Sequence, residues 1–147
     1  MAKPVKLLHS LHRSRLAETL QNGIKALSAF DDLGVEIRQG VVYCWLCRAD
    51  DKRALHGQQP DHIYLEVTVD ESRCTVADME YSSLALMYRQ GWPTKPKNEQ
   101  AAQLFAQIYQ VTSVPLAEYT PGIFFTPEVL VKGDIAPEDV RVTSGLE

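Results

Sequence analysis

Apolar side chains near the start of the chain first alternate with polar ones and then recur at helical spacing. Val5 to Leu11 alternates, which places His9 on the face of Val5 and predicts a short first strand. Ser14 is a suitable helix N-cap, and Gly23 is a suitable residue just beyond the helix end. Between and beside them, apolar residues recur every four positions at Leu16, Leu20 and Ile24. The pattern therefore predicts a strand followed directly by one short helix.

The middle of the chain has the character of buried and half-buried strands. Val41 to Cys47 is rich in β-branched and aromatic residues, which favours a buried strand. Ala49 to Leu55 predicts one or two helical turns. His62 to Val69 alternates apolar and polar residues, as expected of a half-buried strand, and Cys74 to Ala77 predicts a further short strand.

The last third combines helices with short strands. Tyr81 to Tyr88 is expected to be helical, and Asn98 can cap a second helix. The apolar stripe expected on that second helix is Ala101, Leu104, Phe105 and Ile108. Prolines and glycines divide the rest into short strands. Without a repeat, a low-complexity tract or a linker, the sequence predicts one α+β domain over residues 1–147.

Composition and charge narrow the class of protein. A chain of 147 residues with 45% hydrophobic residues can bury a core without disulfides or metals. Its net charge of −4 is unlike that of a general nucleic-acid coat protein, which is normally basic. No apolar run approaches the roughly 20 residues of a membrane span. Three cysteines without a signal-peptide pattern favour a reducing, cytoplasmic compartment.

Two stretches carry a resemblance to a known family. The first is Leu7-Leu8-His9-Ser10-Leu11 followed by the segment from Arg15 to Ile24. The second runs from Thr126 to Val140, in which Glu128-Val129-Leu130-Val131 precedes Ile135-Ala136-Pro137-Glu138. The first resembles the opening of ADP-ribosyltransferase domains. The second is similar to the ending of several families of that fold, including the DarT-like DNA-modifying toxins.

The resemblance implies a split β-sheet core with a few short helices, and NAD as a substrate. Glu128 would then be the catalytic carboxylate, which stabilises the positive charge that develops on the ribose and hydrogen-bonds the 2′-hydroxyl. The implied cofactor-binding residues are His9 for the adenosine ribose, Ser10 for the nicotinamide end, Tyr43 for stacking on the nicotinamide ring, and Arg13 or Arg15 for the pyrophosphate. The implied activity is transfer of ADP-ribose.

The acceptor of that transfer is only partly restricted. Arginine-modifying members have a second glutamate two residues before the catalytic one, where this chain has Thr126. The resemblance therefore implies a nucleic acid or a protein side chain other than arginine, as in a toxin, a phage-defence factor or a nucleic-acid modifier. The alternative from another class is a non-catalytic binding module on the same fold or on an unrelated α+β fold.

Other chemistry-bearing residues have weaker patterns. Cys44-Trp45-Leu46-Cys47 has the spacing of a redox motif but lies within a predicted strand rather than at a helix start. His9 and His12 could join both cysteines in a two-Cys, two-His zinc site, but both pairs would have to leave apolar strands to converge, so we predict that the site holds no metal. A basic patch for nucleic acid would have to come from Lys95, Lys97 and Lys132.

Overall fold

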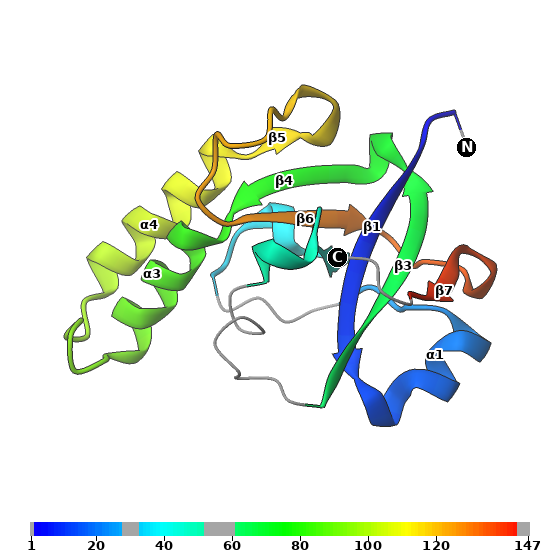
Figure 1. The fold of residues 1–147 in the computed structure, drawn as a ribbon. Coiled ribbons are helices and arrows are strands. Elements are labelled where there is room, and N and C mark those ends of the chain that lie inside the picture. Colours follow the sequence, from blue (N-terminus) through cyan, green and yellow to red (C-terminus); the bar gives the residue numbers. More distant parts are fainter. Residues whose placement is uncertain (1, 28–32, 52–60, 144–147) are drawn as a thin grey trace.

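Two antiparallel sheets and a small set of helices make up the domain (Figure 1). The computed structural model describes residues 2–27, 33–51 and 61–143. The strands are β1 (Pro4–His12), β2 (Val41–Cys44), β3 (His62–Asp70), β4 (Cys74–Asp78), β5 (Val114–Pro115), β6 (Pro127–Lys132) and β7 (Val140–Val142). The helices are α1 (Leu16–Asn22), α3 (Met79–Gln90) and α4 (Glu99–Thr112), with short 3-10 turns between elements. The predicted α+β class is confirmed.

The strands are arranged so that each sheet contains segments far apart in the sequence. One sheet has the order β1-β3-β7 and the other has the order β2-β6-β4-β5. Residue Leu8 joins the two sheets, because its N–H donates to the carbonyl of Trp45 (2.9 Å) and its carbonyl accepts from the N–H of Trp45 (2.7 Å). Strand β2 therefore begins in one sheet, and the chain just beyond it contacts the other sheet.

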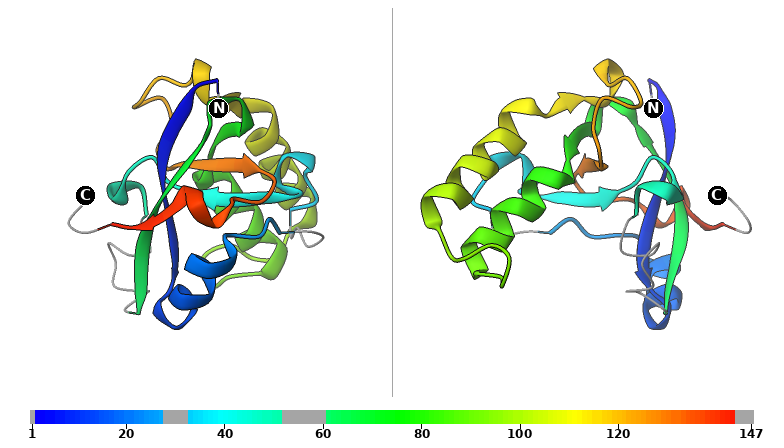
Figure 2. Two further views of the ribbon diagram at one scale, coloured as in Figure 1. Left: turned by 90° about the vertical axis from the view of Figure 1, so that its right-hand side faces the viewer. Right: turned by 60° about the vertical axis from the view of Figure 1, so that its left-hand side comes forward.

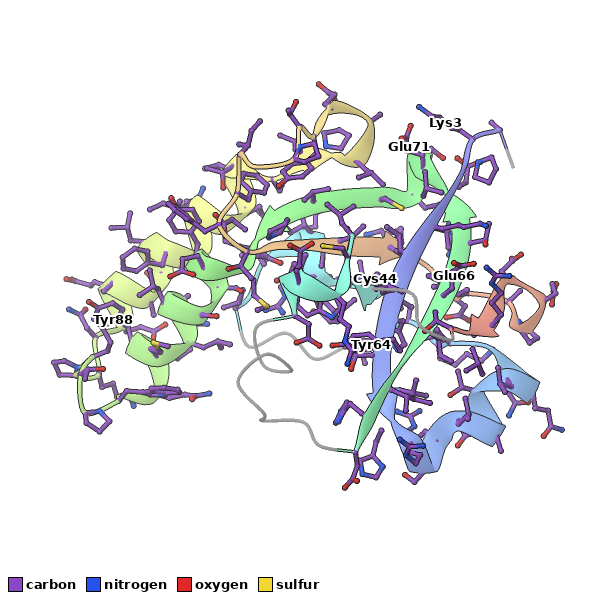
Figure 3. All side chains as sticks on the ribbon, viewed as in Figure 1. Lys3, Cys44, Tyr64, Glu66, Glu71 and Tyr88 are labelled. Atoms are coloured by element: carbon purple, nitrogen blue, oxygen red, sulfur yellow. The ribbon has the colours of Figure 1, made fainter. Side chains whose placement is uncertain are left out.

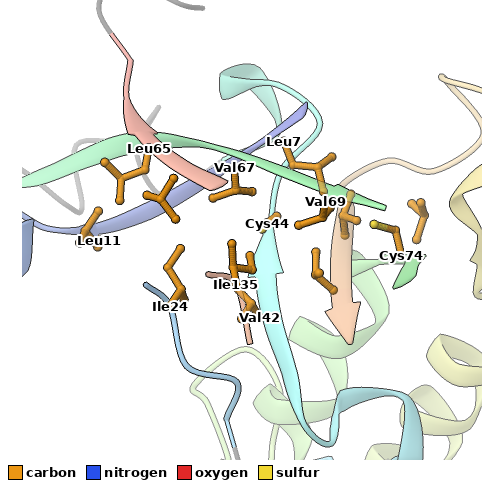
Figure 4. Close-up of a cluster of buried hydrophobic side chains, with 14 residues drawn as sticks. Leu7, Leu11, Ile24, Val42, Cys44, Leu65, Val67, Val69, Cys74 and Ile135 are labelled. Atoms are coloured by element: carbon orange, nitrogen blue, oxygen red, sulfur yellow. The ribbon is translucent and has the colours of Figure 1, made fainter. Parts of the chain in front are cut away.

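The two sheets and the α3–α4 helix pair form three layers, with an apolar cluster between each two neighbouring layers. Figure 2 shows the α3–α4 pair on one side of the β2-β6-β4-β5 sheet and strands β1 and β3 on its other side. The larger cluster lies between the sheets and includes Leu7, Val42 and Val67 (Figure 4). The smaller cluster lies between β2-β6-β4 and the helices, and includes Leu130 and Tyr109. Alternate residues of β2, β4 and β6 are therefore buried on opposite faces.

The first helix forms one turn differently from the prediction. Leu16–Asn22 is helical, but its N-cap residue is Arg15, and Ser14 instead donates its N–H to His12 Nδ1 (3.2 Å). Leu20 is 38% exposed and Thr19 is buried, so the predicted four-residue stripe was wrong for Leu20. A 3-10 turn precedes α1 and shifts the buried face of the short helix.

Gly23 ends α1 as predicted and allows a close approach to the C-terminal part of the chain. Its φ is 79°, and its N–H donates to the carbonyl of Thr19 (2.8 Å). The next residue, Ile24, exchanges two main-chain hydrogen bonds with Ile135 (2.9 and 2.8 Å). A left-handed conformation at this position suits glycine, which has no Cβ to clash.

The predicted strand from Val41 to Cys47 is shorter in the structure. Strand β2 ends at Cys44, because the next residue, Trp45, turns its main chain toward Leu8. Helical turns were predicted over Ala49–Leu55. The structure has a 3-10 turn over Arg48–Asp50, which overlaps the start of that range, and residues 52–60 lie outside the described residues.

The hydrophobic pattern predicts the buried residues of strand β3 correctly but not those of helix α4. Leu65, Val67 and Val69 are fully buried, as the alternation predicts. The Asn98 cap of α4 is also confirmed, since its Oδ1 accepts from the N–H of Ala101 (3.1 Å). The predicted stripe on α4 was wrong by one position, because Leu104 is 58% exposed while the buried residues are Ala102, Ala106 and Tyr109. No helix among the described residues is long and apolar enough to cross a membrane.

Candidate functional site

His9 and Tyr43 meet where the two sheets come together. The Nδ1 of His9, on β1, lies 2.8 Å from the main-chain carbonyl of Tyr43, on β2. A carbonyl can only accept, so Nδ1 carries the proton, and Nε2 of the neutral ring is left as an acceptor. The contact fixes both the tautomer and the orientation of the imidazole.

The surroundings of His9 favour its neutral form. Burial lowers the pKa of His9 below its ordinary value, the hydrogen bond to Tyr43 opposes this shift, and the positive charge of Arg15 adds to it. At neutral pH the ring is therefore uncharged and can accept a hydrogen bond through Nε2.

A cavity of about 610 Å³ opens beside His9. Its volume lies within the roughly 300–1,000 Å³ typical of small-molecule sites. The polar lining side chains are His9, Arg15, Glu18, Thr19, Asn22 and Lys25, and the apolar lining comes from residues such as Leu11, Ile24 and Val42. Helix α1 and the segment that follows it form one wall, and the β1–β2 junction forms the other.

Glu128 is buried in a separate polar cluster. It is the second residue of β6 and only 2% exposed. Its Oε1 lies 3.9 Å from an Nη of Arg38, whose side chain is 15% exposed. The guanidinium of Arg38 also lies over the rings of Tyr43 (4.8 Å to the centroid) and Tyr109 (5.6 Å). An arginine held by a carboxylate and two aromatic faces is well fixed in position.

The cavity and the cluster lie on opposite sides of strand β2. His9 shares the face of Leu7, in the cluster between the sheets, whereas Glu128 shares the face of Leu130, under the helices. Tyr43 belongs to both groups, because its carbonyl contacts His9 and its ring contacts Arg38. Glu128 is not among the residues that line the cavity. Strand β2 is at the edge of its sheet, and its outer side pairs with Leu27 at Val41.

The other predicted cofactor-binding residues are placed differently. Ser10 points away from the cavity on the other face of β1, and its Oγ is buried without a hydrogen-bond partner among the described residues. Arg13 is exposed and does not line the cavity, whereas Arg15 does. Of the two arginines proposed for the pyrophosphate, Arg15 is therefore the better placed.

Arg38 is the functional candidate that the sequence patterns missed. It ends a 3-10 turn, Glu36–Arg38, just before β2, and nothing in its local sequence marks it. The cluster that contains Arg38 includes residues from β2, α4 and β6, so the signal exists only in three dimensions. A buried carboxylate is normally paired with a cation, so burial of Glu128 in a C-terminal strand would predict an arginine or lysine partner.

The described residues give little support to a redox motif, a zinc site or a basic patch for nucleic acid. No group of three or more His, Cys, Asp or Glu side chains within residues 2–27, 33–51 and 61–143 is arranged to hold a metal. Cys47 donates its thiol to Asp50 Oδ2 (3.4 Å), while Cys44 is buried between the sheets. Lys95 and Lys97 lie in the α3–α4 connection, at the opposite end of the molecule from the end of β6 that carries Lys132 (Figure 1).

Comparison of the sequence with protein-family models and with curated proteins gives no match.

Proposed function

We propose that the protein transfers ADP-ribose from NAD to a macromolecular acceptor, either a nucleic acid or a protein side chain other than arginine. In this reaction the bond between nicotinamide and ribose breaks, and nicotinamide leaves with the bonding electrons. A nucleophile of the acceptor bonds to the same ribose carbon and loses its proton. Positive charge builds on the ribose, so an anion held near it accelerates the reaction.

The observation that carries the proposal is an unbroken series of contacts between the three residues of the resemblance. His9 contacts the main chain of Tyr43 (2.8 Å), the ring of Tyr43 lies against Arg38 (4.8 Å), and Arg38 contacts Glu128 (3.9 Å). These residues come from β1, β2 and β6, which are far apart in the sequence. Their connection through Tyr43 and Arg38 supports a shared role, although His9 and Glu128 lie on opposite sides of β2.

Each residue has a role that follows from its surroundings. The cavity holds part of NAD, with Nε2 of neutral His9 accepting from a ribose hydroxyl and Arg15 facing the pyrophosphate. Glu128 supplies the carboxylate, and Arg38 fixes its position. Tyr43 is the residue shared by the two regions, because its carbonyl contacts His9 and its ring contacts Arg38.

A binding module without catalysis is the second candidate, and one observation favours it. Glu128 is 2% exposed, lies against Arg38, and does not line the cavity. A glutamate whose work is only to neutralise a buried arginine would look the same. In that case the cavity beside His9 binds a ligand that is not cleaved.

Binding and turnover of NAD separate the two candidates. The test variant is Glu128→Gln, which keeps the size of the side chain and removes its charge. A matched control is Glu66→Gln, because Glu66 is also buried (5% exposed) and also paired with an arginine, Arg141 at 2.6 Å. Glu66 lies on β3, away from the helical end marked by Tyr88 (Figure 3).

NAD binding is measured by calorimetry and nicotinamide release by chromatography. We expect the unmodified chain and Glu66→Gln to bind NAD and release nicotinamide slowly, and Glu128→Gln to bind NAD but release about 10²–10³-fold less, as when one charge-stabilising group is lost. Binding without release in all three chains supports the binding module. If the unmodified chain does not bind NAD, the transferase proposal is wrong.

A further inference from the structure

Asp78 accepts main-chain hydrogen bonds from two directions at the start of strand β6. It is the last residue of β4, is 2% exposed, and lies directly opposite Pro127 in the sheet. Its Oδ1 accepts from the N–H groups of Glu80 (3.0 Å) and Thr126 (3.1 Å), and its Oδ2 accepts from the N–H of Phe125 (3.1 Å). One carboxylate thus caps helix α3 and holds the two residues before Pro127.

Besides Asp78, one packed side chain and one main-chain bond hold the chain directly before β6. Proline has no N–H, so Pro127 cannot donate to β4 in the sheet ladder. The side chains of Ile123 and Phe125 are 63% and 81% exposed, so packing of this segment comes from Phe124, which lies against the larger cluster with its ring centroid 5.2 Å from that of Tyr119. The N–H of Met79 also donates to the carbonyl of Thr126 (2.8 Å). Asp78 and Met79 therefore provide the main-chain contacts to the two residues directly before β6.

The position of β6 in turn determines the position of Glu128. Glu128 is opposite Ala77, the residue just before Asp78, and follows Pro127 directly. Its carboxylate lies 3.9 Å from Arg38, so a small shift of β6 along its axis changes this contact. The Asp78 bonds act on the amides two and three residues before Glu128.

We propose that Asp78 is a positioning residue for Glu128: by binding the main chain of Phe125 and Thr126 it sets the register and depth at which the Glu128 carboxylate is presented. The role rests on the proposed transferase function, because positioning matters for turnover only if Glu128 acts on NAD. Asp78 itself contacts neither substrate nor cavity.

Asp78→Asn is a selective test. Asparagine caps helices about as well as aspartate, so its carbonyl oxygen keeps the bonds from Glu80 and Thr126. Its NH₂ group replaces Oδ2 and faces the N–H of Phe125, so one bond is lost and two donors oppose each other. The matched control is Asp70→Asn. Asp70 accepts from the N–H of Ser72 (3.0 Å) at the end of β3, in the other sheet.

Kinetics of nicotinamide release give the first readout. We expect Asp78→Asn to lower kcat on the order of 10²-fold, the loss associated with a misplacement of about 1 Å in a reacting group, with KM for NAD unchanged. Asp70→Asn should change neither constant. If Asp78→Asn leaves kcat unchanged, or if kcat and NAD affinity fall together, Asp78 has no positioning role.

A second readout does not need activity and separates the two proposals. The ¹³C chemical shift of the Glu128 carboxyl carbon should change in Asp78→Asn and stay constant in Asp70→Asn. If the unmodified chain neither binds nor cleaves NAD, the proposed function fails, and an altered Glu128 signal then still supports the structural part of the inference. An unaltered signal overturns the inference whatever the activity.

A chemical substitution covers the case in which Asp78→Asn does not fold. Replacement of Phe125 by phenyllactic acid converts its amide N–H into an ester oxygen. This change removes one hydrogen bond to Asp78 while the cap of α3 and the exposed ring remain. The same fall in kcat, without a change in KM, is expected, and an unchanged kcat would overturn the proposal.

Discussion

Adding a single methyl group at Gly23 should strongly reduce the stability of the fold. An alanine Cβ at Gly23 would overlap the carbonyl oxygen of Ile135 and lie 3.0 Å from the nitrogen of Pro137. The backbone φ there is 79°, which L-residues rarely adopt. The matched control is Gly40, with a φ of 64° and no atom within 4 Å of its added Cβ.

A positive φ destabilises both alanine variants. At Gly40 a left-handed backbone costs alanine about 1–2 kcal/mol. At Gly23, where ψ is −167°, the backbone lies in a region almost restricted to glycine and costs about 1–3 kcal/mol, so the backbone contributions nearly cancel in the comparison. At Gly23 the overlap adds about 1–3 kcal/mol for overpacking. It also disturbs the pair of main-chain bonds between Ile24 and Ile135, each of which contributes about 0.5–1.5 kcal/mol. The free energy of unfolding should therefore fall by about 2–6 kcal/mol more in Gly23→Ala than in Gly40→Ala.

Chemical denaturation measures both free energies of unfolding, and thermal melting provides a check. At about 2–4 °C per kcal/mol for a domain of this size, Gly23→Ala should melt at least about 4 °C below Gly40→Ala. Equal losses in the two variants would refute the reasoning, because they would mean that the chain after α1 moves away from Ile135 without cost.

Two further predictions concern titratable side chains. Burial lowers the pKa of His9 in the folded protein, so the unfolded chain binds its proton first as the pH falls. Stability should therefore decrease from about pH 7.5 to pH 5.5, through the unfolded value near 6.5, and the decrease should be smaller in His9→Gln but not in the exposed control His12→Gln. Denaturant midpoints at the two pH values measure this, and a similar decrease in all three chains would contradict it. Burial also raises the pKa of the Cys74 thiol to about 11 and that of Cys44 further still, so a thiol reagent should modify Cys47 first, with the other two reacting only after unfolding. Mass spectrometry of the labelled peptides identifies the order, and early labelling of Cys44 would show that the sheets separate readily.

The parts of the fold that follow from local patterns were predictable. Alternation in β3 gave the buried residues Leu65, Val67 and Val69, because a strand covered on one side repeats every two residues. The prediction of the buried stripe on α4 was wrong because this helix packs against both α3 and the sheet. Small alanines face α3 and Tyr109 fills the space near the sheet, so the larger Leu104 is left in solvent. Residue size at a close helix contact is not visible in a hydrophobicity pattern.

The candidate site was predictable only where sequence motifs mark it. The structure brings His9 and Tyr43 into contact, whereas Glu128 does not line the cavity beside them. The partnership of Glu128 with Arg38 could not be read from either neighbourhood, since it depends on how β6 inserts beside β2. The same is true of Asp78, whose sequence context predicts only a helix cap.

The place of β6 between β2 and β4 has a consequence for how the chain is made. Strand β2 pairs with β6, with Val41 opposite Lys132 and Cys44 opposite Val129, and β4 pairs with the other edge of β6. Neither strand therefore has its main partner until β6 has been synthesised. Pairings between such distant segments form slowly, because a large loop must close first. On a chain that emerges from its N-terminus, β1 and β3 can pair early, whereas the central strand of the second sheet is among the last to be synthesised. Glu128 is on that strand, so a partly synthesised chain has the cavity-side histidine but cannot yet have the assembled carboxylate cluster.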